Sequence, residues 1–140
     1  MRLLSWWVLV CLSLAVLLAE NGRDFAGQYA ISNVVENGET VNTTLTVRLI
    51  NYSGRDIAGA RLLLQADPPA ARETALATDL ALANHTHKTI RADITISKAE
   101  LDRWQRGAPP HLAAEFADGD GRLVRRPVEL VREPRIEEEQ

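Results

Sequence analysis

Cysteine, lysine and aromatic residues are scarce in this 140-residue chain. Its single cysteine, Cys11, has no second cysteine to pair with, so the fold must be stabilised by an apolar core and not by an intramolecular disulfide. A formal net charge of −3, with both signs mixed along the chain, gives no patch suited to nucleic acid, and we expect no nucleic-acid partner. Arginine is used almost to the exclusion of lysine, a pattern typical of GC-rich bacterial genomes.

Catalytic signatures are also missing. The sequence has no Gly-x-Ser-x-Gly motif, and its acidic residues fall in turns or at outward positions of the expected strands. We therefore predict that the chain is not an enzyme and needs no cofactor. About 120 residues remain after the N-terminal segment, enough for one domain with its own core.

The N-terminal segment predicts export. Arg2 precedes an apolar run from Leu3 to Ala19, which is the pattern of a secretory signal peptide. As a helix this run would reach roughly 26 Å, slightly less than a bilayer core. Cleavage after Ala19 has a small residue at only one of the two required positions, whereas cleavage after Ala15 satisfies both with Ser13 but leaves the apolar residues 16–19 on the mature chain. Residues 1–19 thus favour a cleaved signal peptide, with an uncleaved membrane anchor as the alternative, and the location is periplasmic or secreted.

Residues 27–131 predict an all-β domain. Period-two alternation is sharpest in Val41–Leu49, and Asn37-Gly38 before it favours a type I′ hairpin with residues 28–36. The same reasoning predicts five more strands, at residues 57–65, 73–82, 90–97, 112–116 and 124–130. Asp67-Pro68-Pro69 interrupts the pattern, because proline cannot donate to a strand ladder. Residues 132–140 form a charged tail too polar to order itself.

One short helix is expected at about residues 97–106. Ser97 and Glu100 have the Ser-x-x-Glu spacing of a capping box, and Gly107 with two prolines ends the helix. Leu101 and Trp104 lie on one face of it, so they would seal the open end of the core. The alternative for Trp104 is an exposed anchor for a partner or a sugar.

Seven short strands with one helical corner predict an antiparallel Ig-like β-sandwich. Residues 45–64, with the segment Leu-Ile-Asn-Tyr-Ser-Gly-Arg-Asp-Ile-Ala-Gly-Ala, resemble the corner between the second and third strands of bacterial extracytoplasmic Ig-like and fibronectin-type-III-like modules, including those related to cell adhesion. The paired cysteines, third-strand tryptophan and tyrosine corner of antibody domains are absent. The resemblance implies an extracellular binding, adhesion or structural role and assigns no catalytic residue.

Three sets of residues could carry chemistry. His85, His87 and His111 could hold a transition metal if their loops converged, but no further ligand completes the set and exposed-turn positions explain them better. Asp118-Gly119-Asp120-Gly121 contains part of a calcium loop, yet it is also a favoured hairpin turn. Asn42, Asn51 and Asn84 begin Asn-x-Ser/Thr sequences, which accept glycans only in a eukaryotic secretory pathway.

These observations lead to one expected function and two alternatives. We expect an exported, non-catalytic Ig-like module for protein binding, adhesion or envelope structure, whose partner is another envelope or extracellular protein. The alternatives are a periplasmic metal-binding protein that uses the three histidines, and a membrane-anchored accessory domain held by residues 1–19. The sequence leaves the oligomeric state open.

Overall fold

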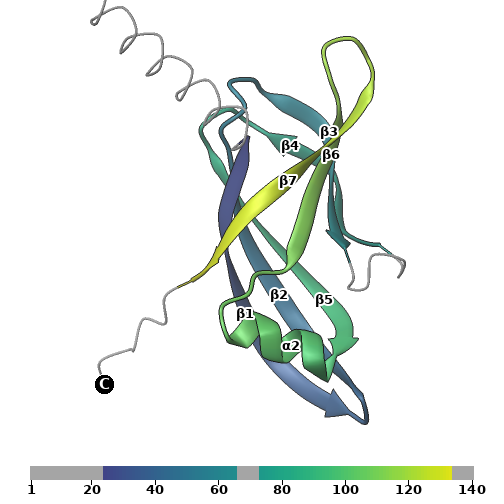
Figure 1. Cartoon of the computed structure of the whole chain (residues 1–140). Coiled ribbons are helices and arrows are strands. Elements are labelled where there is room, and N and C mark those ends of the chain that lie inside the picture. The colour runs from purple at the N-terminus through teal and green to yellow at the C-terminus, as the bar shows by residue number, and fades with distance from the viewer. Residues whose placement is uncertain (1–23, 66–72, 134–140) are drawn as a thin grey trace, which may run out of the picture.

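The computed structural model describes residues 24–65 and 73–133 (Figure 1). Apart from residues 66–72, these ranges contain the whole of the predicted β domain at 27–131. The predicted leader at residues 1–19, the proline-containing turn at 67–69 and most of the predicted tail lie outside the described residues.

Seven strands and one helix make up the described residues, and the expectation of an all-β fold with one short helix is confirmed. Along the chain the elements are β1 (Phe25–Asn37), β2 (Thr40–Asn51), β3 (Ile57–Gln65), β4 (Thr74–Leu82), β5 (His87–Ser97), α2 (Lys98–Gln105), β6 (His111–Ala117) and β7 (Leu123–Arg132).

The first two strands form the expected antiparallel hairpin, but its turn is shifted by one residue. Asn37 pairs with Thr40, so the two turn residues are Gly38 and Glu39. Only Gly38 has a positive φ, 67°, which is the requirement for the first central residue of a type II′ turn. The predicted type I′ turn at Asn37-Gly38 is therefore wrong, because a type I′ turn needs a positive φ at both central residues and here only Gly38 has one.

All seven strands belong to one continuous sheet with the order β4-β3-β6-β7-β1-β2-β5. Five neighbouring pairs are antiparallel, but β1 and β7 pair in parallel, from Phe25 opposite Val128 to Tyr29 opposite Arg132. The prediction of antiparallel pairing throughout is thus wrong. The predicted first strand begins at residue 28 and so leaves out residues 25–27. These three residues supply three of the five pairs in the parallel β1–β7 ladder.

Gly27 is the residue that lets β1 fit between its two neighbours. It pairs with Leu49 of β2 on one side and with Leu130 of β7 on the other. A Cβ atom built at this position would lie 2.2 Å from the backbone oxygen of Arg48, closer than real Cβ contacts allow. Any side chain here would force the β1 and β2 backbones apart.

The sheet curls so that the inward side chains of all its strands share one apolar core. Strands that are not neighbours meet across this core, since the rings of Phe25 in β1 and Phe116 in β6 are 5.6 Å apart in an edge-on arrangement. Tyr29 is fully buried, and its hydroxyl donates a 2.7 Å hydrogen bond to the carbonyl oxygen of Trp104 in α2. This bond attaches the helix to the sheet.

Helix α2 closes the end of the core next to the β1–β2 hairpin (Figure 1). Ser97 caps it, because its hydroxyl oxygen accepts a 3.1 Å hydrogen bond from the backbone N–H of Glu100. Glu100, Leu101 and Trp104 are its buried residues, and Trp104 is only 2% exposed. In this structure the tryptophan packs in the core and is not available as a surface anchor.

Alkaline pH should destabilise the fold through Tyr29. Burial raises the pKa of its phenol above the ordinary value of 10.0, although nearby Arg132 lowers it. The folded state therefore keeps this proton to higher pH than the unfolded state, and its stabilising contribution is lost as pH rises from 10 through the folded pKa. Urea unfolding between roughly pH 8 and pH 11 should show a steeper loss of stability in the wild type than in Tyr29→Phe. Equal slopes in the two proteins would contradict this.

Candidate functional site

The three histidines lie at two opposite ends of the sheet. His85 and His87 are exposed at the β4–β5 turn, where the backbone N–H of His85 donates to the carbonyl oxygen of Asn51. His111 begins β6 and pairs with Gln65, the last residue of β3. Strand β3 separates the two ends by roughly 26 Å at about 3.3 Å per residue. In residues 24–65 and 73–133, no group of three metal-ligating side chains lies close enough to hold an ion.

Asn51 organises the end of the sheet that holds His85. Its amide nitrogen donates to the carbonyl oxygens of Arg55, at 2.7 Å, and Leu82, at 2.9 Å, and its amide oxygen accepts from the N–H of Ser53 at 2.9 Å. The residue is 1% exposed. It therefore joins three segments as a buried structural amide, and in the folded protein its side chain is not available to accept a glycan.

The 118–121 segment forms the turn between β6 and β7. One carboxylate oxygen of Asp118 accepts 2.9 Å hydrogen bonds from the backbone N–H groups of both Asp120 and Arg122. The N–H of Asp118 in turn donates to the carbonyl oxygen of Arg122 at 2.8 Å. The acid that would head a calcium loop is thus used to hold the turn itself.

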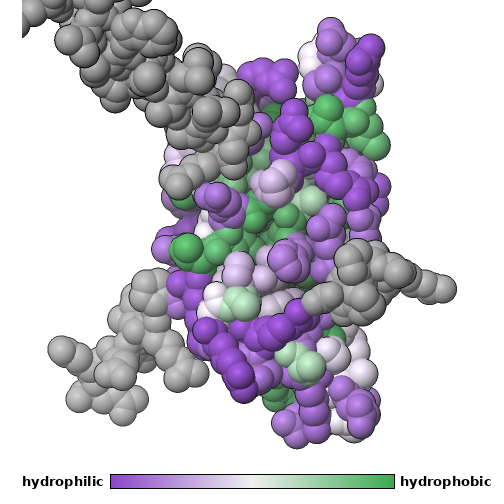
Figure 2. Space-filling model, viewed as in Figure 1, coloured by the Kyte–Doolittle hydropathy of each residue, from purple (hydrophilic) through white to green (hydrophobic). Residues whose placement is uncertain are grey.

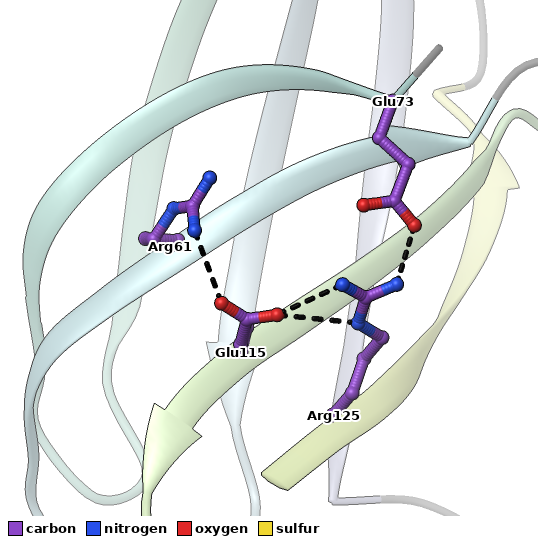
Figure 3. Close-up of polar contacts among 4 residues, drawn as sticks. All are labelled: Arg61, Glu73, Glu115 and Arg125. Atoms are coloured by element: carbon purple, nitrogen blue, oxygen red, sulfur yellow. Dashed lines mark hydrogen bonds and ion pairs between the residues drawn. The ribbon is translucent and has the colours of Figure 1, made fainter. Parts of the chain in front are cut away.

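A network of four charged side chains lies on the face of β3, β6 and β7 that points away from the core (Figure 3). Glu115 is at its centre and its side chain is 7% exposed. One of its oxygens accepts from Arg61 at 3.1 Å, and the other accepts from Arg125 at 2.9 and 3.3 Å. Arg125 also pairs with Glu73.

The four side chains of this network pair with one another through hydrogen bonds and opposite charges. The hydrogen bonds that Arg125 donates to Glu115, and then the one to Glu73, raise the pKa of Arg125 above its ordinary value, so this guanidinium stays charged. Across residues 24–65 and 73–133, no buried side-chain nitrogen or oxygen lacks a hydrogen-bond partner. The network therefore holds three strands in register and leaves no unpaired base or nucleophile at its centre.

A pocket lies on the opposite half of the sheet, and most of its polar side chains are exposed. It has a volume of about 470 Å³. Its lining comes from β1, β2 and β5 and consists of Asn33, Asn42, Thr43, Thr44, Asp93, Ile94 and Thr95. Sequence reasoning missed this pocket, because its residues lie on three separate strands and each of them fits an ordinary inward or outward position of its own strand. The only local signal was Ser32-Asn33 inside an otherwise apolar segment, where asparagine tolerates unusual backbone geometry.

Comparisons with known proteins give little support to any family. No family model matches the chain, and no curated protein matches it. A solved structure described as "X-ray structure of Northeast Structural Genomics Consortium target SoR45" is similar at 7% identity and a TM-score of 0.44, covering 79% of this chain and 84% of the other. Within the described part of the chain, no helix has the length and apolar character to cross a membrane.

Replacement of Glu115 by glutamine should destabilise the domain. The change leaves Arg61 and Arg125 facing each other without the carboxylate between them. Because both guanidinium groups are almost half exposed, water screens part of the effect, and we expect a loss of about 1–2 kcal/mol in the free energy of unfolding.

The matched control is Asp102→Asn, which removes the exposed pair between Asp102 and Arg106 in α2. Chemical denaturation should show a change below about 0.5 kcal/mol for this variant. A loss in Asp102→Asn as large as that in Glu115→Gln would show that burial of the Glu115 carboxylate has no special effect.

Proposed function

We propose that this chain is an exported, non-catalytic Ig-like β-sandwich that binds another envelope or extracellular protein through the free edge of β5. The leader at residues 1–19 supports export to the periplasm or cell exterior. The strand order supports the Ig-like assignment, and the regularity of β5 supports the binding mode.

The strand order divides at the parallel β1–β7 pair into a β1-β2-β5 group and a β7-β6-β3-β4 group. In Ig sandwiches strands A, B, E and D share one layer, and in variable-type domains strand C′ joins the layer of G, F and C. The β1-β2-β5 group corresponds to A, B and E, and the β7-β6-β3-β4 group corresponds to G, F, C and C′, which supports the Ig-like proposal even without a strand D in the described residues. The parallel pair then acts as the seam between the layers.

The single observation that carries the binding proposal is the contrast between the two edge strands. β5 pairs with β2 in eleven consecutive positions without a register shift, from Thr40 opposite Ser97 to Ile50 opposite His87. β4 pairs with β3 in an irregular register with three shifts, and Asp79 in it has a φ of 53°. Irregular edges resist the addition of another strand, whereas a straight, regular edge accepts one.

The faces of β5 also suit an added strand. Ile90, Ile94 and Ile96 face the core and remain 6–7% exposed at the edge of the sheet. Thr89, Arg91 and Thr95 are exposed and point the other way. An extended segment of a partner protein could pair with the β5 backbone and extend both faces, as in recognition by β-strand addition.

Site-specific photo-crosslinking tests this proposal. A photoreactive residue at Thr89, on β5, should give a discrete adduct with an envelope or extracellular protein in the cells that express the chain. The same residue at Thr78, an exposed threonine on the irregular edge strand β4, should give none. The protein in the adduct is then identified by mass spectrometry.

Two lysine substitutions provide the matched control. Ala92 on β5 and Ala77 on β4 are both half-buried against the core. Because an inward-pointing charge blocks strand addition, Ala92→Lys should abolish the Thr89 adduct and Ala77→Lys should leave it intact, with the melting temperatures of both variants measured alongside. Equal adducts from both edges, an adduct only with a second copy of this chain, or an adduct that persists in folded Ala92→Lys would overturn the proposal.

Export predicts a specific N-terminus. N-terminal sequencing of the chain from the extracytoplasmic fraction should find Glu20 or Val16 as the first residue, as expected for cleavage after Ala19 or Ala15. Membrane-associated protein that retains residues 1–19 would instead support the anchored alternative. Full-length protein confined to the cytoplasm would contradict export altogether.

A further inference from the structure

The pocket beside β1 is formed by a break in the strand. Between Ser32, opposite Thr44, and Val35, opposite Asn42, β1 carries one residue more than β2. At this bulge Asn33 has a φ of 53°, a left-handed conformation uncommon for residues other than glycine. Bulges often redirect a side chain toward a functional surface, and here Asn33 is turned to line the pocket.

Two threonine hydroxyls fix the orientation of the polar groups in this pocket. The hydroxyl of Thr44 donates to one carboxylate oxygen of Asp93 at 2.7 Å and accepts from the amide nitrogen of Asn33 at 3.4 Å. The hydroxyl of Thr95 donates to the amide oxygen of Asn42 at 2.7 Å. Thr44 itself is buried, at 6% exposed, whereas Asn33 and Asp93 are exposed, so this arrangement is open to solvent on the side of the pocket.

These bonds leave a defined set of groups for a ligand. The amide nitrogen of Asn42 remains as a donor, and the amide oxygen of Asn33 and the second carboxylate oxygen of Asp93 remain as acceptors. A ligand that fits them must both donate and accept hydrogen bonds at neighbouring atoms. Adjacent hydroxyl groups do this, since each hydroxyl is a donor and an acceptor.

The composition of the lining further restricts the chemical class of ligand that the pocket could hold. Asp93 is its only charged residue, so an anion would be repelled, and a hard cation would find a single carboxylate where it needs several oxygen ligands. An apolar ligand would leave the amides and the carboxylate unsatisfied. The pocket is an open depression of about 470 Å³, so a ligand held there would remain partly in contact with solvent.

We propose that this pocket binds a neutral sugar unit through its adjacent hydroxyl groups. Asp93 and Asn33 accept hydrogen bonds from two of the hydroxyls, and Asn42 donates to a hydroxyl oxygen. This second binding activity lies on the outer face of the sheet, does not rest on strand addition at β5, and can fail or hold independently of it.

A chemical-shift titration tests the proposal with defined probes. Glucose, mannose and N-acetylglucosamine are added separately to the ¹⁵N-labelled chain, with glycerol as an acyclic polyol for comparison. At least one sugar should produce saturable shifts at millimolar concentration, centred on the backbone amides of Asn33, Asn42 and Asp93. Glycerol should produce no saturation over the same range.

Three variants locate the binding. Asn33→Gly removes the side-chain amide, and glycine adopts the positive φ of the bulge without strain. Asp93→Asn preserves the shape of the side chain but removes its charge. Each should weaken sugar binding about tenfold, as expected for the loss of one good hydrogen bond. Thr46→Ala, on β2 outside the pocket lining, should bind as the wild type does.

Several results would overturn the proposal. These are no saturable shift with any sugar, saturation by glycerol equal to that by the sugars, or unchanged binding in both Asn33→Gly and Asp93→Asn when their amide spectra show a native fold. Shifts at these amides only on addition of a protein partner would assign the pocket to protein recognition instead.

Discussion

The parallel pairing of β1 with β7 is the constraint on which the rest of the structure depends. It joins the β1-β2-β5 group to the β7-β6-β3-β4 group by a strand ladder, and the inward side chains of both groups then pack together in one core. Gly27 lets the same segment of β1 pair with β2 on its other side, since a Cβ atom there would lie 2.2 Å from the backbone oxygen of Arg48 in β2. The same short segment carries Phe25, which contacts Phe116, and Tyr29, which holds Trp104 and so the helix. This five-residue ladder thus joins the two groups of strands, and its residues also contribute to the core and hold helix α2 at one end of it.

Joining the groups at this seam leaves β4 and β5 as the two outer strands, and the chain treats them differently. β4 is irregular and contains a left-handed Asp79, as is common where strand addition must be prevented. The half of β1 beyond Tyr29 has only β2 as a ladder partner among the described strands, and the bulge at Asn33 interrupts it. Of these edges β5 alone is long and regular, and the proposed pairing with another chain rests on this difference (Figure 1).

The positions of the strands and the helix could be predicted from the sequence because they follow from local patterns. Alternation located β2 and β5, and Ser97 with Glu100 located the start of α2. The wrong predictions concern backbone geometry that alternation does not report. Alternation over residues 57–65 places Ala58 on the same face as the buried Ala60, yet Ala58 is exposed, because Gly59 has a φ of 67° and the register of β3 shifts between Ile57 and Ala60. The pocket residues come from three strands, and only the tertiary pairing of Asn42 with Thr95 and of Thr44 with Asp93 brings them together.

The two polar clusters on the outer surfaces differ in what they leave free. Around Glu115, both carboxylate oxygens are occupied by arginines, so the cluster binds itself and strengthens the β3-β6-β7 register. In the pocket, the Thr44 hydroxyl bonds one carboxylate oxygen of Asp93 and the Thr95 hydroxyl bonds the amide oxygen of Asn42, and the other polar atom of each of these two side chains makes no hydrogen bond within the described residues. Figure 2 shows a surface on which hydrophilic residues surround a central group of hydrophobic ones, so polarity alone does not distinguish a binding site here. The two clusters differ in hydrogen-bond completeness, and this difference is the basis for proposing ligand recognition on the β1-β2-β5 group and not around Glu115.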